Sequence, residues 1–338
     1  MIDELCIIGR PGLVGGADTE LFDQLKVWLR MGLKCRIIPT AEAKYPINFS
    51  HPNLVIDEIK RYSACSGKHV ISYCNLDFLH DIEIIRKYAK TISWASCMCF
   101  NFKSEIEAHR KGLIDFFLYQ TNHQLHNCGV NLMAANSNYN VIPIVPYFDA
   151  SNFPFVSSRP EIKYGRISRA APDKYSRDQF VIYHLARCNY TKGIVLGWSD
   201  ELNNVYCNDY HYQYFKDNKL IDFYNQNEIS AQEFYKQCGI VCMSTGTFEN
   251  LPRVGFEAMA SGSVLVVDNR GGWTCEVDDG VTGYLCDTSY DFIINLKKLI
   301  NNPELRNSMA VKAREKLEAE HSYHASASRW NKFFHLLG

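Results

Sequence analysis

The sequence predicts an α/β protein built from two domains, each with a parallel sheet. Residues 5–8 form a short apolar run, a glycine-rich loop follows at 9–16, and apolar residues from Leu21 to Leu29 recur at helical spacing. Gly32 ends that helix, and residues 33–38 are again strand-like. Strand, loop, helix and strand in this order open a parallel sheet, and a chain of 338 residues is long enough for two such cores.

The rest of the first domain, residues 1–156, continues the same alternation. Residues 68–73 are strand-like, 81–89 helical and 91–94 strand-like, and two more apolar runs lie at 116–119 and 140–145. Pro143 and Pro146 then interrupt the pattern. Residues 157–178 are polar with little periodicity, and we interpret them as a linker between the domains.

The second domain, residues 179–320, begins in this interpretation with a strand at 179–183. Ser230 and Glu233 have the spacing of a capping box and predict a short helix, which leads into a strand at 239–243. A helix over 254–260 ends at Gly262, and an apolar strand follows at 264–267. Two helices are predicted within 291–319, and the amphipathic segment 321–338 closes the chain. Because parallel sheets bind ligands at the carboxyl ends of their strands, two such domains suggest a binding cleft between them.

Composition and charge argue against several classes of protein. The formal net charge is -1, so no overall positive field recruits nucleic acid or an anionic membrane. The first residues lack the pattern of a secretion signal, and no apolar run is long enough to predict a transmembrane helix. The 13 cysteines include no Cys-x-x-Cys pair, which favours a reduced, cytoplasmic protein without a zinc site.

The densest chemical signal lies between residues 244 and 285. Glu249 and Glu257 stand eight positions apart, the first after a predicted buried strand and the second in the early turns of the next helix. Between them, the backbone N–H groups at the helix start, around residues 251–254, can bind an anion or sugar hydroxyls. The alternative is that Glu257 only complements the helix dipole and that residues 257–262 are a packed helix with a glycine stop.

This stretch resembles the Glu-x7-Glu motif of the family 4 glycosyltransferases, the glycosyl transferases group 1. The family pattern reads E-G-x-P-x-x-x-x-E-A-M-A-x-G, and Asn250 replaces its first glycine here. The matching positions are Glu249, Pro252, Glu257, Ala258, Met259, Ala260 and Gly262. The loop Gly271-Gly272, followed by Glu276, also fits the family's next segment.

Two further segments are similar to the same family. Arg187 and Lys192 have the spacing of its G-R-x-x-x-x-K-G segment, with Ala186 in place of the glycine. A guanidinium and an ammonium suit a diphosphate whose negative charge grows as the glycosidic bond breaks; on their own they would be two basic residues on a loop. Gly15 and Gly16 resemble the glycine pair of the family's first loop. That loop lacks the G-x-G-x-x-G fingerprint, which disfavours NAD.

The resemblance implies the GT-B fold, in which two facing Rossmann-like domains enclose a cleft and a C-terminal helix crosses back to the first domain. It also implies a retaining transfer of a sugar from a nucleotide-diphosphate sugar, with no cofactor and no metal. Glu249 would contact the donor sugar, Glu257 the ribose hydroxyls, and Arg187 and Lys192 the diphosphate. The donor site would be completed by Gly15, Gly16, Asn250, Leu251, Pro252 and Arg253.

The acceptor and the oligomeric state stay open at this stage. A glycan or another hydroxyl compound is expected, but residues 91–96 lack the histidine that family members often carry near the donor sugar. Six basic residues crowd the predicted linker over 159–177, which is either a solvated segment or a seat for an anionic acceptor: Arg159, Lys163, Arg166, Arg169, Lys174 and Arg177. A nucleic-acid acceptor would make the protein a glycosyltransferase of modified DNA bases. A phosphorylase, a nucleotide-sugar epimerase or a non-catalytic nucleotide-sugar binder would also suit the same scaffold, because the fold does not choose among them.

Overall fold

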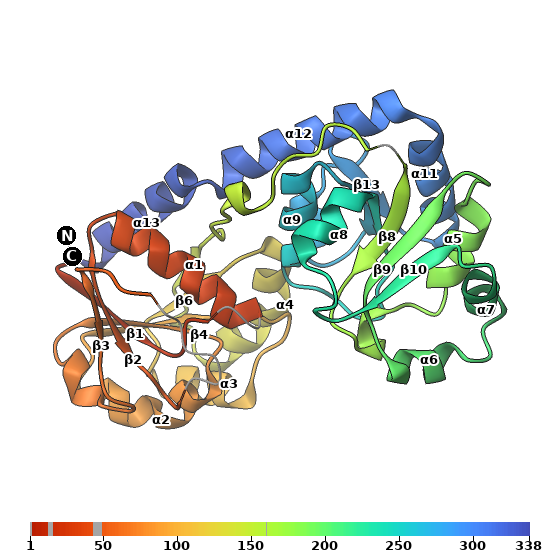
Figure 1. Cartoon of the computed structure of the whole chain (residues 1–338). Coiled ribbons are helices and arrows are strands. Elements are labelled where there is room, and N and C mark those ends of the chain that lie inside the picture. The colour runs from red at the N-terminus through yellow and green to blue at the C-terminus, as the bar shows by residue number, and fades with distance from the viewer. Residues whose placement is uncertain (1, 13–15, 43–48, 160) are drawn as a thin grey trace. The chain divides into compact units, whose positions relative to one another are not determined.

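The chain forms two α/β units, each with its own parallel sheet. The computed structural model describes residues 2–12, 16–42, 49–159 and 161–338. The first unit comprises Met1–Asp149 together with Glu320–Gly338, and the second comprises Ala150–Ala319 (Figure 1). Both units contain a parallel sheet flanked by helices, so the prediction of two Rossmann-like α/β domains is confirmed.

The sheet of the first unit has the strand order β3-β2-β1-β4-β5-β6-β7, and its strands run parallel. The strands are β1 (Glu4–Ile8), β2 (Lys34–Ile38), β3 (Leu54–Ile56), β4 (His69–Tyr73), β5 (Thr91–Ala95), β6 (Phe116–Tyr119) and β7 (Val141–Pro143). The α-helices are α1 (Gly16–Arg30), α2 (Leu76–Arg86), α3 (Lys103–Arg110), α4 (Asn122–Ala135) and α13 (Tyr323–Leu337), and η1 (Tyr62–Cys65) is a 3-10 turn.

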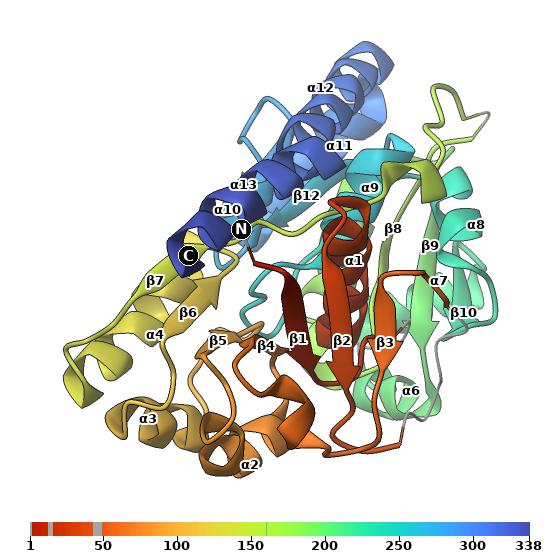
Figure 2. The ribbon, with the colours of Figure 1, turned by 90° about the vertical axis from the view of Figure 1, so that its left-hand side faces the viewer.

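Alternation along the strands of this sheet creates two cores. In β1, Leu5 and Ile7 pack with α1 and α13, whereas Cys6 and Ile8 pack with α2, α3 and α4. Helix α1 lies beside the strands β1 and β2 (Figure 2). The C-terminal helix α13 is held against α1 by Trp330, whose ring centroid lies 5.0 Å from that of Trp28.

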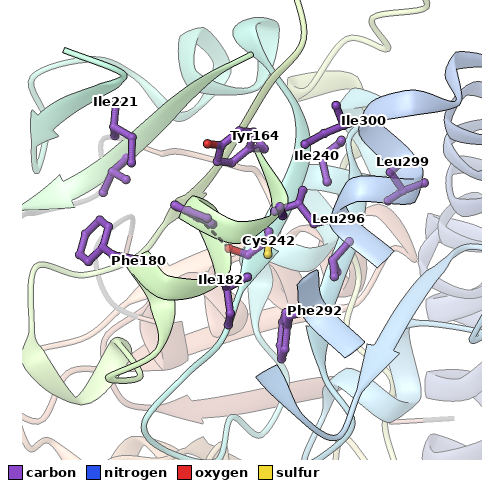
Figure 3. Close-up of a cluster of buried hydrophobic side chains, with 14 of the residues drawn as sticks. Tyr164, Phe180, Ile182, Ile221, Ile240, Cys242, Phe292, Leu296, Leu299 and Ile300 are labelled. Carbon is purple, nitrogen blue, oxygen red and sulfur yellow. Dashed lines mark hydrogen bonds between the residues drawn. The ribbon is translucent and has the colours of Figure 1, made fainter. Parts of the chain in front are cut away.

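The sheet of the second unit has the order β10-β9-β8-β11-β12-β13 and is also parallel. The strands are β8 (Lys163–Ile167), β9 (Lys192–Trp198), β10 (Ile221–Asn225), β11 (Cys238–Met243), β12 (Val264–Asp268) and β13 (Gly283–Cys286). The α-helices are α5 (Gln179–Ala186), α6 (Asp200–Tyr206), α7 (Tyr210–Asp217), α8 (Ala231–Gln237), α9 (Arg253–Ser261), α10 (Trp273–Glu276), α11 (Ser289–Asn301) and α12 (Pro303–His321); the 3-10 turns are η2 (Ala150–Asn152) and η3 (Pro172–Lys174). One core packs α5, α7 and α11 on this sheet, and it includes Tyr164, Phe180, Cys242 and Leu296 (Figure 3).

Two predictions about the start of the second domain are wrong. The predicted linker, 157–178, contains β8, which pairs with both β9 and β11 at the centre of the sheet. The apolar run at 179–183, predicted as a strand, lies in α5. A short apolar run does not separate a buried strand from a buried helix, and here Phe180 and Tyr183 are buried on one side of a helix.

Candidate functional site

The candidate site lies at the carboxyl ends of β8 and β11. The chain leaves β8 toward β9 on one side, and β11 joins β8 on the other side, so these two strands form a topological switch point of the sheet. The loops after them meet: the Ser176 N–H donates to the Ser244 carbonyl (3.1 Å), and the Thr247 hydroxyl donates to the Asp173 carbonyl (3.4 Å). Open parallel sheets bind their ligands at such a point.

The two loops are joined by an ion pair between Lys174 and Glu249. The Lys174 ammonium lies 2.6 Å from Glu249 Oε1, and each side chain is only 17% exposed. Lys174 ends η3, after the carboxyl end of β8, whereas Glu249 lies on the loop between β11 and α9. A cation and an anion are therefore held together, largely shielded from water, at the edge where a ligand is expected.

A fully buried arginine supports both loops from below. Arg166, in β8, donates to Gln179 Oε1 (2.6 Å), to the Ser244 carbonyl (3.2 Å) and to the carbonyl of Lys174. Its guanidinium also stacks on the Tyr175 ring, 3.6 Å from the centroid. Arg166 therefore fixes the backbone that carries Lys174 relative to the loop after β11.

A third loop, between β12 and α10, closes on Glu249 from the other side. The Gly272 N–H donates to the Glu249 carbonyl (2.8 Å). A Cβ atom on Gly272 would lie 1.6 Å from the Asn250 carbonyl oxygen, and Gly271 has a φ of +61°. Only glycine fits this close approach of two backbones, which is a physical reason for the Gly271-Gly272 pair.

Glu257 lies in α9, one helix turn beyond its start. Tyr235 donates a hydrogen bond of 3.2 Å to Glu257 Oε2. Burial raises the pKa of Glu257 from 4.5 to about 7, and the positive charge of Arg253 acts in the opposite direction. Arg253 is the first residue of α9 and Pro252 its N-cap residue, while Asn250 is buried and Leu251 partly exposed just before them. The predicted donor residues 249–253 and Glu257 therefore lie together around the start of one helix.

Glu276, at the end of α10, adds a third carboxyl group nearby. It is 2% exposed, and neither carboxylate oxygen has a hydrogen-bond partner among the described residues. Burial, aided by the charge of Glu249, raises the pKa of Glu276 well above 4.5. Its carboxylate packs against Gly255 of α9, because a Cβ atom there would lie 1.6 Å from Glu276 Oε2.

The structure does not bring Arg187 and Lys192 to this site, which corrects the prediction that they bind the diphosphate there. Arg187 is the C-cap residue of α5; it donates to the Tyr214 hydroxyl (2.6 Å) and lies over that ring. Lys192 opens β9, where it pairs in register with Lys163, the first residue of β8. Both residues are therefore at the amino end of the sheet, about 20 Å from the carboxyl end at about 3.3 Å per strand residue.

The sequence analysis assigned Arg169 and Lys174 to the basic linker, whereas the structure places Lys174 at this site, paired with Glu249. Arg169 and Lys174 repeat the same R-x4-K spacing eighteen positions earlier, directly after a strand that had been interpreted as a linker. Arg169 is exposed, and its guanidinium lies 3.5 Å from Asp173. The order strand, arginine, lysine was the available signal, and the polar composition of β8 concealed it.

The basic segment 159–177 does not form one positive surface. Arg159 donates to four backbone carbonyls, those of Val156, Tyr235, Ser261 and Gly262, and so holds the fold together. Lys163 pairs with Asp222 at 2.8 Å, and Arg166 is buried. These three basic side chains have structural partners inside the second unit, so the structure does not support a common seat for an anionic acceptor.

Two predicted residues come from the first unit. Gly16 is the exposed first residue of α1, and Gly15 lies outside the described residues. Among the residues that the structure describes, no group of three or more His, Cys, Asp or Glu side chains could hold a metal ion. Within the same part of the chain, no helix is both long and apolar enough to cross a membrane.

Comparison with protein families finds a match that covers part of the candidate site. Residues 191–316, less than half of the chain, match the family model described as glycosyl transferases group 1. The segment includes Glu249, Glu257 and Glu276, whereas Lys174 precedes it.

Two curated proteins are similar over part of the chain. The alpha-1,3/1,6-mannosyltransferase ALG2 of Dictyostelium discoideum is 29% identical over 120 residues, which are 35% of this chain and 28% of that protein. The putative glycosyltransferase YtcC of Bacillus subtilis is 37% identical over 98 residues, 28% of this chain and 24% of that protein. The similarity thus spans about a quarter of the length of these relatives.

Solved structures match nearly the whole chain. Anabaena HepE in complex with UDP and glucose has a TM-score of 0.71 at 14% identity, covering 98% of this chain and 99% of that one. Sucrose-phosphate synthase from Thermosynechococcus elongatus has a TM-score of 0.78 at 12% identity, covering 99% of both chains. At such low identity the likeness shows the shared fold of two Rossmann-like domains.

Proposed function

We propose that this protein is a retaining, metal-independent glycosyltransferase of the family 4 type that takes a sugar from a nucleotide-diphosphate donor. The observation that carries the proposal is the pairing of Lys174 with Glu249 at the switch point of the second sheet. Glu257 follows eight residues later beside the start of α9, within the segment that matches the glycosyltransferase family model. A cation, two carboxyl groups and a helix start together suit a nucleoside diphosphate linked to a sugar.

In this proposal, Lys174 and the exposed Arg169 replace Arg187 and Lys192 as the cations of the diphosphate. Negative charge develops on the leaving diphosphate as the bond to the anomeric carbon breaks, and a fixed ammonium stabilises it. Glu249 contacts the sugar and supports the positive charge of the transition state, and Glu257 binds the ribose hydroxyls. Backbone groups of residues 250–253 complete the donor site, and contacts from Gly15 and Gly16 stay a prediction.

The transfer itself requires no protein base in this proposal. The bond from the anomeric carbon to the acceptor oxygen forms on the face that the diphosphate leaves, and the acceptor proton passes to the departing phosphate oxygen.

We propose a hydroxyl group of a glycan or a lipid-linked compound as the acceptor. The nucleic-acid hypothesis depended on the basic segment 159–177, and Arg159, Lys163 and Arg166 of that segment have structural partners. A phosphorylase would require inorganic phosphate and an epimerase no acceptor at all, so analysis of the reaction products separates both from a transferase.

A thermal-shift screen with UDP, GDP, ADP and their sugar conjugates, with and without EDTA, tests the donor site. A nucleotide at about a hundred times its dissociation constant should stabilise the fold by roughly 2.7 kcal/mol. Lys174→Met should reduce this stabilisation to roughly 1.4 kcal/mol, which corresponds to about tenfold weaker binding, and Lys192→Met, which removes the same charge at the opposite end of the sheet, should keep the full shift. No shift with any of these compounds, or equal loss in both variants, would contradict the proposed site. NMR of the product then reports whether the anomeric configuration is retained.

A further inference from the structure

The ammonium proposed to bind the diphosphate forms an ion pair with a carboxylate of the same unit. Lys174 Nζ lies 2.6 Å from Glu249 Oε1, a charge-assisted hydrogen bond between two side chains of which less than a fifth is exposed. Under the proposed function, Lys174 binds the diphosphate and Glu249 binds the sugar. The same contact therefore blocks both roles until it breaks.

Hydrogen bonds hold the backbone in place at both residues of this ion pair. The Lys174 carbonyl accepts from the buried Arg166, and the Glu249 carbonyl accepts from the Gly272 N–H at 2.8 Å. Around Glu249 the close approach of Gly271, whose added Cβ would meet the Glu249 carbonyl oxygen at 2.4 Å, leaves little room for the loop to shift. Separation of the two charges is therefore a rotation of side chains, chiefly of the long and flexible lysine.

A diphosphate is a stronger partner for the ammonium than one carboxylate. It carries more negative charge and offers several acceptor oxygens to the three N–H donors of Lys174. It can therefore displace Glu249 at the cost of one ion pair, and the ammonium keeps an anionic partner throughout. The released carboxylate then lies beside the ligand that released it.

We propose, on the basis of the proposed function, that Lys174 and Glu249 form an exchange pair, in which the incoming diphosphate takes Lys174 and thereby frees Glu249 for the sugar. The pair makes the arrangement of the sugar-binding carboxylate depend on the diphosphate. Glu249 is thus a competitor of the diphosphate for Lys174 as well as a ligand of the sugar, and its removal strengthens binding of a nucleoside diphosphate that carries no sugar.

Isothermal titration calorimetry with UDP, GDP and ADP tests this exchange, using the nucleotide that the wild-type protein binds. Glu249→Gln should bind it about 5-fold more tightly, the factor that corresponds to loss of one competing ion pair. Lys174→Met should bind it about tenfold more weakly, because a charged hydrogen bond to phosphate is lost. In the Lys174→Met background, Glu249→Gln should bring no further gain, since the two residues act through one contact.

A matched control lies at the amino end of β8, the strand that precedes Lys174. Lys163, which opens β8, forms an ion pair of 2.8 Å with Asp222, so Asp222→Asn also releases a lysine from a carboxylate. This variant should leave nucleotide affinity unchanged. A gain in Asp222→Asn equal to that in Glu249→Gln would show a general effect of charge and overturn the exchange.

The remaining outcomes separate the two proposals. If the wild type binds a nucleoside diphosphate but Glu249→Gln binds it no more tightly, or if the gain persists without Lys174, the exchange is refuted and the donor site stands. If the wild type binds none of the nucleotides, the proposed function fails and the exchange with it.

Discussion

The pKa of Glu257 leads to a specific prediction about how stability changes with pH. Burial raises this pKa from 4.5 to about 7, so the carboxyl group holds its proton more tightly in the folded chain than in the unfolded one. The cost of ionising Glu257 is absent below pH 4.5, grows as the pH rises to about 7 and is complete above that value. Stability attributable to this group is therefore lost as the pH rises through this window.

Glu257→Gln isolates that cost, because glutamine keeps the shape and an acceptor for the Tyr235 hydroxyl but never ionises. The rise in pKa corresponds to about 3 kcal/mol. The Glu257 side chain is partly exposed at the surface of the second unit, which reduces this figure, and we expect about 2 kcal/mol. Glu257→Gln should match the wild type near pH 4.5 and exceed it by about 2 kcal/mol at pH 8.5.

Urea denaturation of both proteins at several pH values, followed by far-UV circular dichroism, measures the difference. Glu304→Gln, on the exposed start of α12, controls for the loss of one negative charge. A difference between Glu257→Gln and wild type that stays constant from pH 4.5 to 8.5, or one that shrinks as the pH rises, would refute the reasoning.

Three further predictions follow from the packing. Gly272→Ala should lower the free energy of unfolding by about 2 kcal/mol and weaken nucleotide binding, because its Cβ atom would overlap the Asn250 carbonyl. As a control, Gly129→Ala in α4, where the nearest atom would lie 3.6 Å from the added Cβ, should not lower stability. Equal stability of the two variants in urea would contradict this prediction. The pKa of Cys74 is lowered, chiefly by a hydrogen bond with the Cys97 thiol. Cys97→Ala should therefore slow the reaction of Cys74 with iodoacetamide at pH 7.5, measured by mass spectrometry after brief treatment. An unchanged rate of labelling would refute the pairing. Trp330→Ala should destabilise the first unit by about 4 kcal/mol, measured by urea denaturation, because it removes a fully buried ring and the 2.6 Å hydrogen bond of its indole N–H to Gln24. A loss below about 1 kcal/mol would show that α13 contributes little to stability.

Local patterns in the sequence were sufficient for much of the fold. The strand–loop–helix order at residues 5–38 predicted β1, α1 and β2, and the spacing of Ser230 and Glu233 predicted the start of α8, where Ser230 accepts from the Glu233 N–H. Gly262 ends α9 with a φ of +74°, as its position predicted. These features depend on neighbours within a few residues, which the sequence displays directly.

Features that depend on distant partners were misjudged. Residues 163–167 contain a lysine, a glycine and an arginine, a composition that suggested a linker, yet they form the strand β8. Arg166 is tolerated there because Gln179, Tyr175 and two loop carbonyls surround its guanidinium. No local pattern reveals such partners in advance.

The candidate site combines features that local sequence predicted with a contact between distant segments that it did not predict. The eight-residue interval between Glu249 and Glu257 and the glycine pair after β12 are written in the sequence, because a strand end, a turn and a helix start determine their geometry within one short segment. The cation of the site is different, since R-x4-K occurs both at Arg169–Lys174 and at Arg187–Lys192 with identical spacing. Only the order of the strands decides between them: β8 ends beside β11 and brings Lys174 to Glu249 across 75 residues of chain, whereas β9 begins at the opposite edge with Lys192. Spacing along the chain determines geometry inside an element, but the contact between two loops depends on which strands lie side by side, and that is a property of the folded sheet.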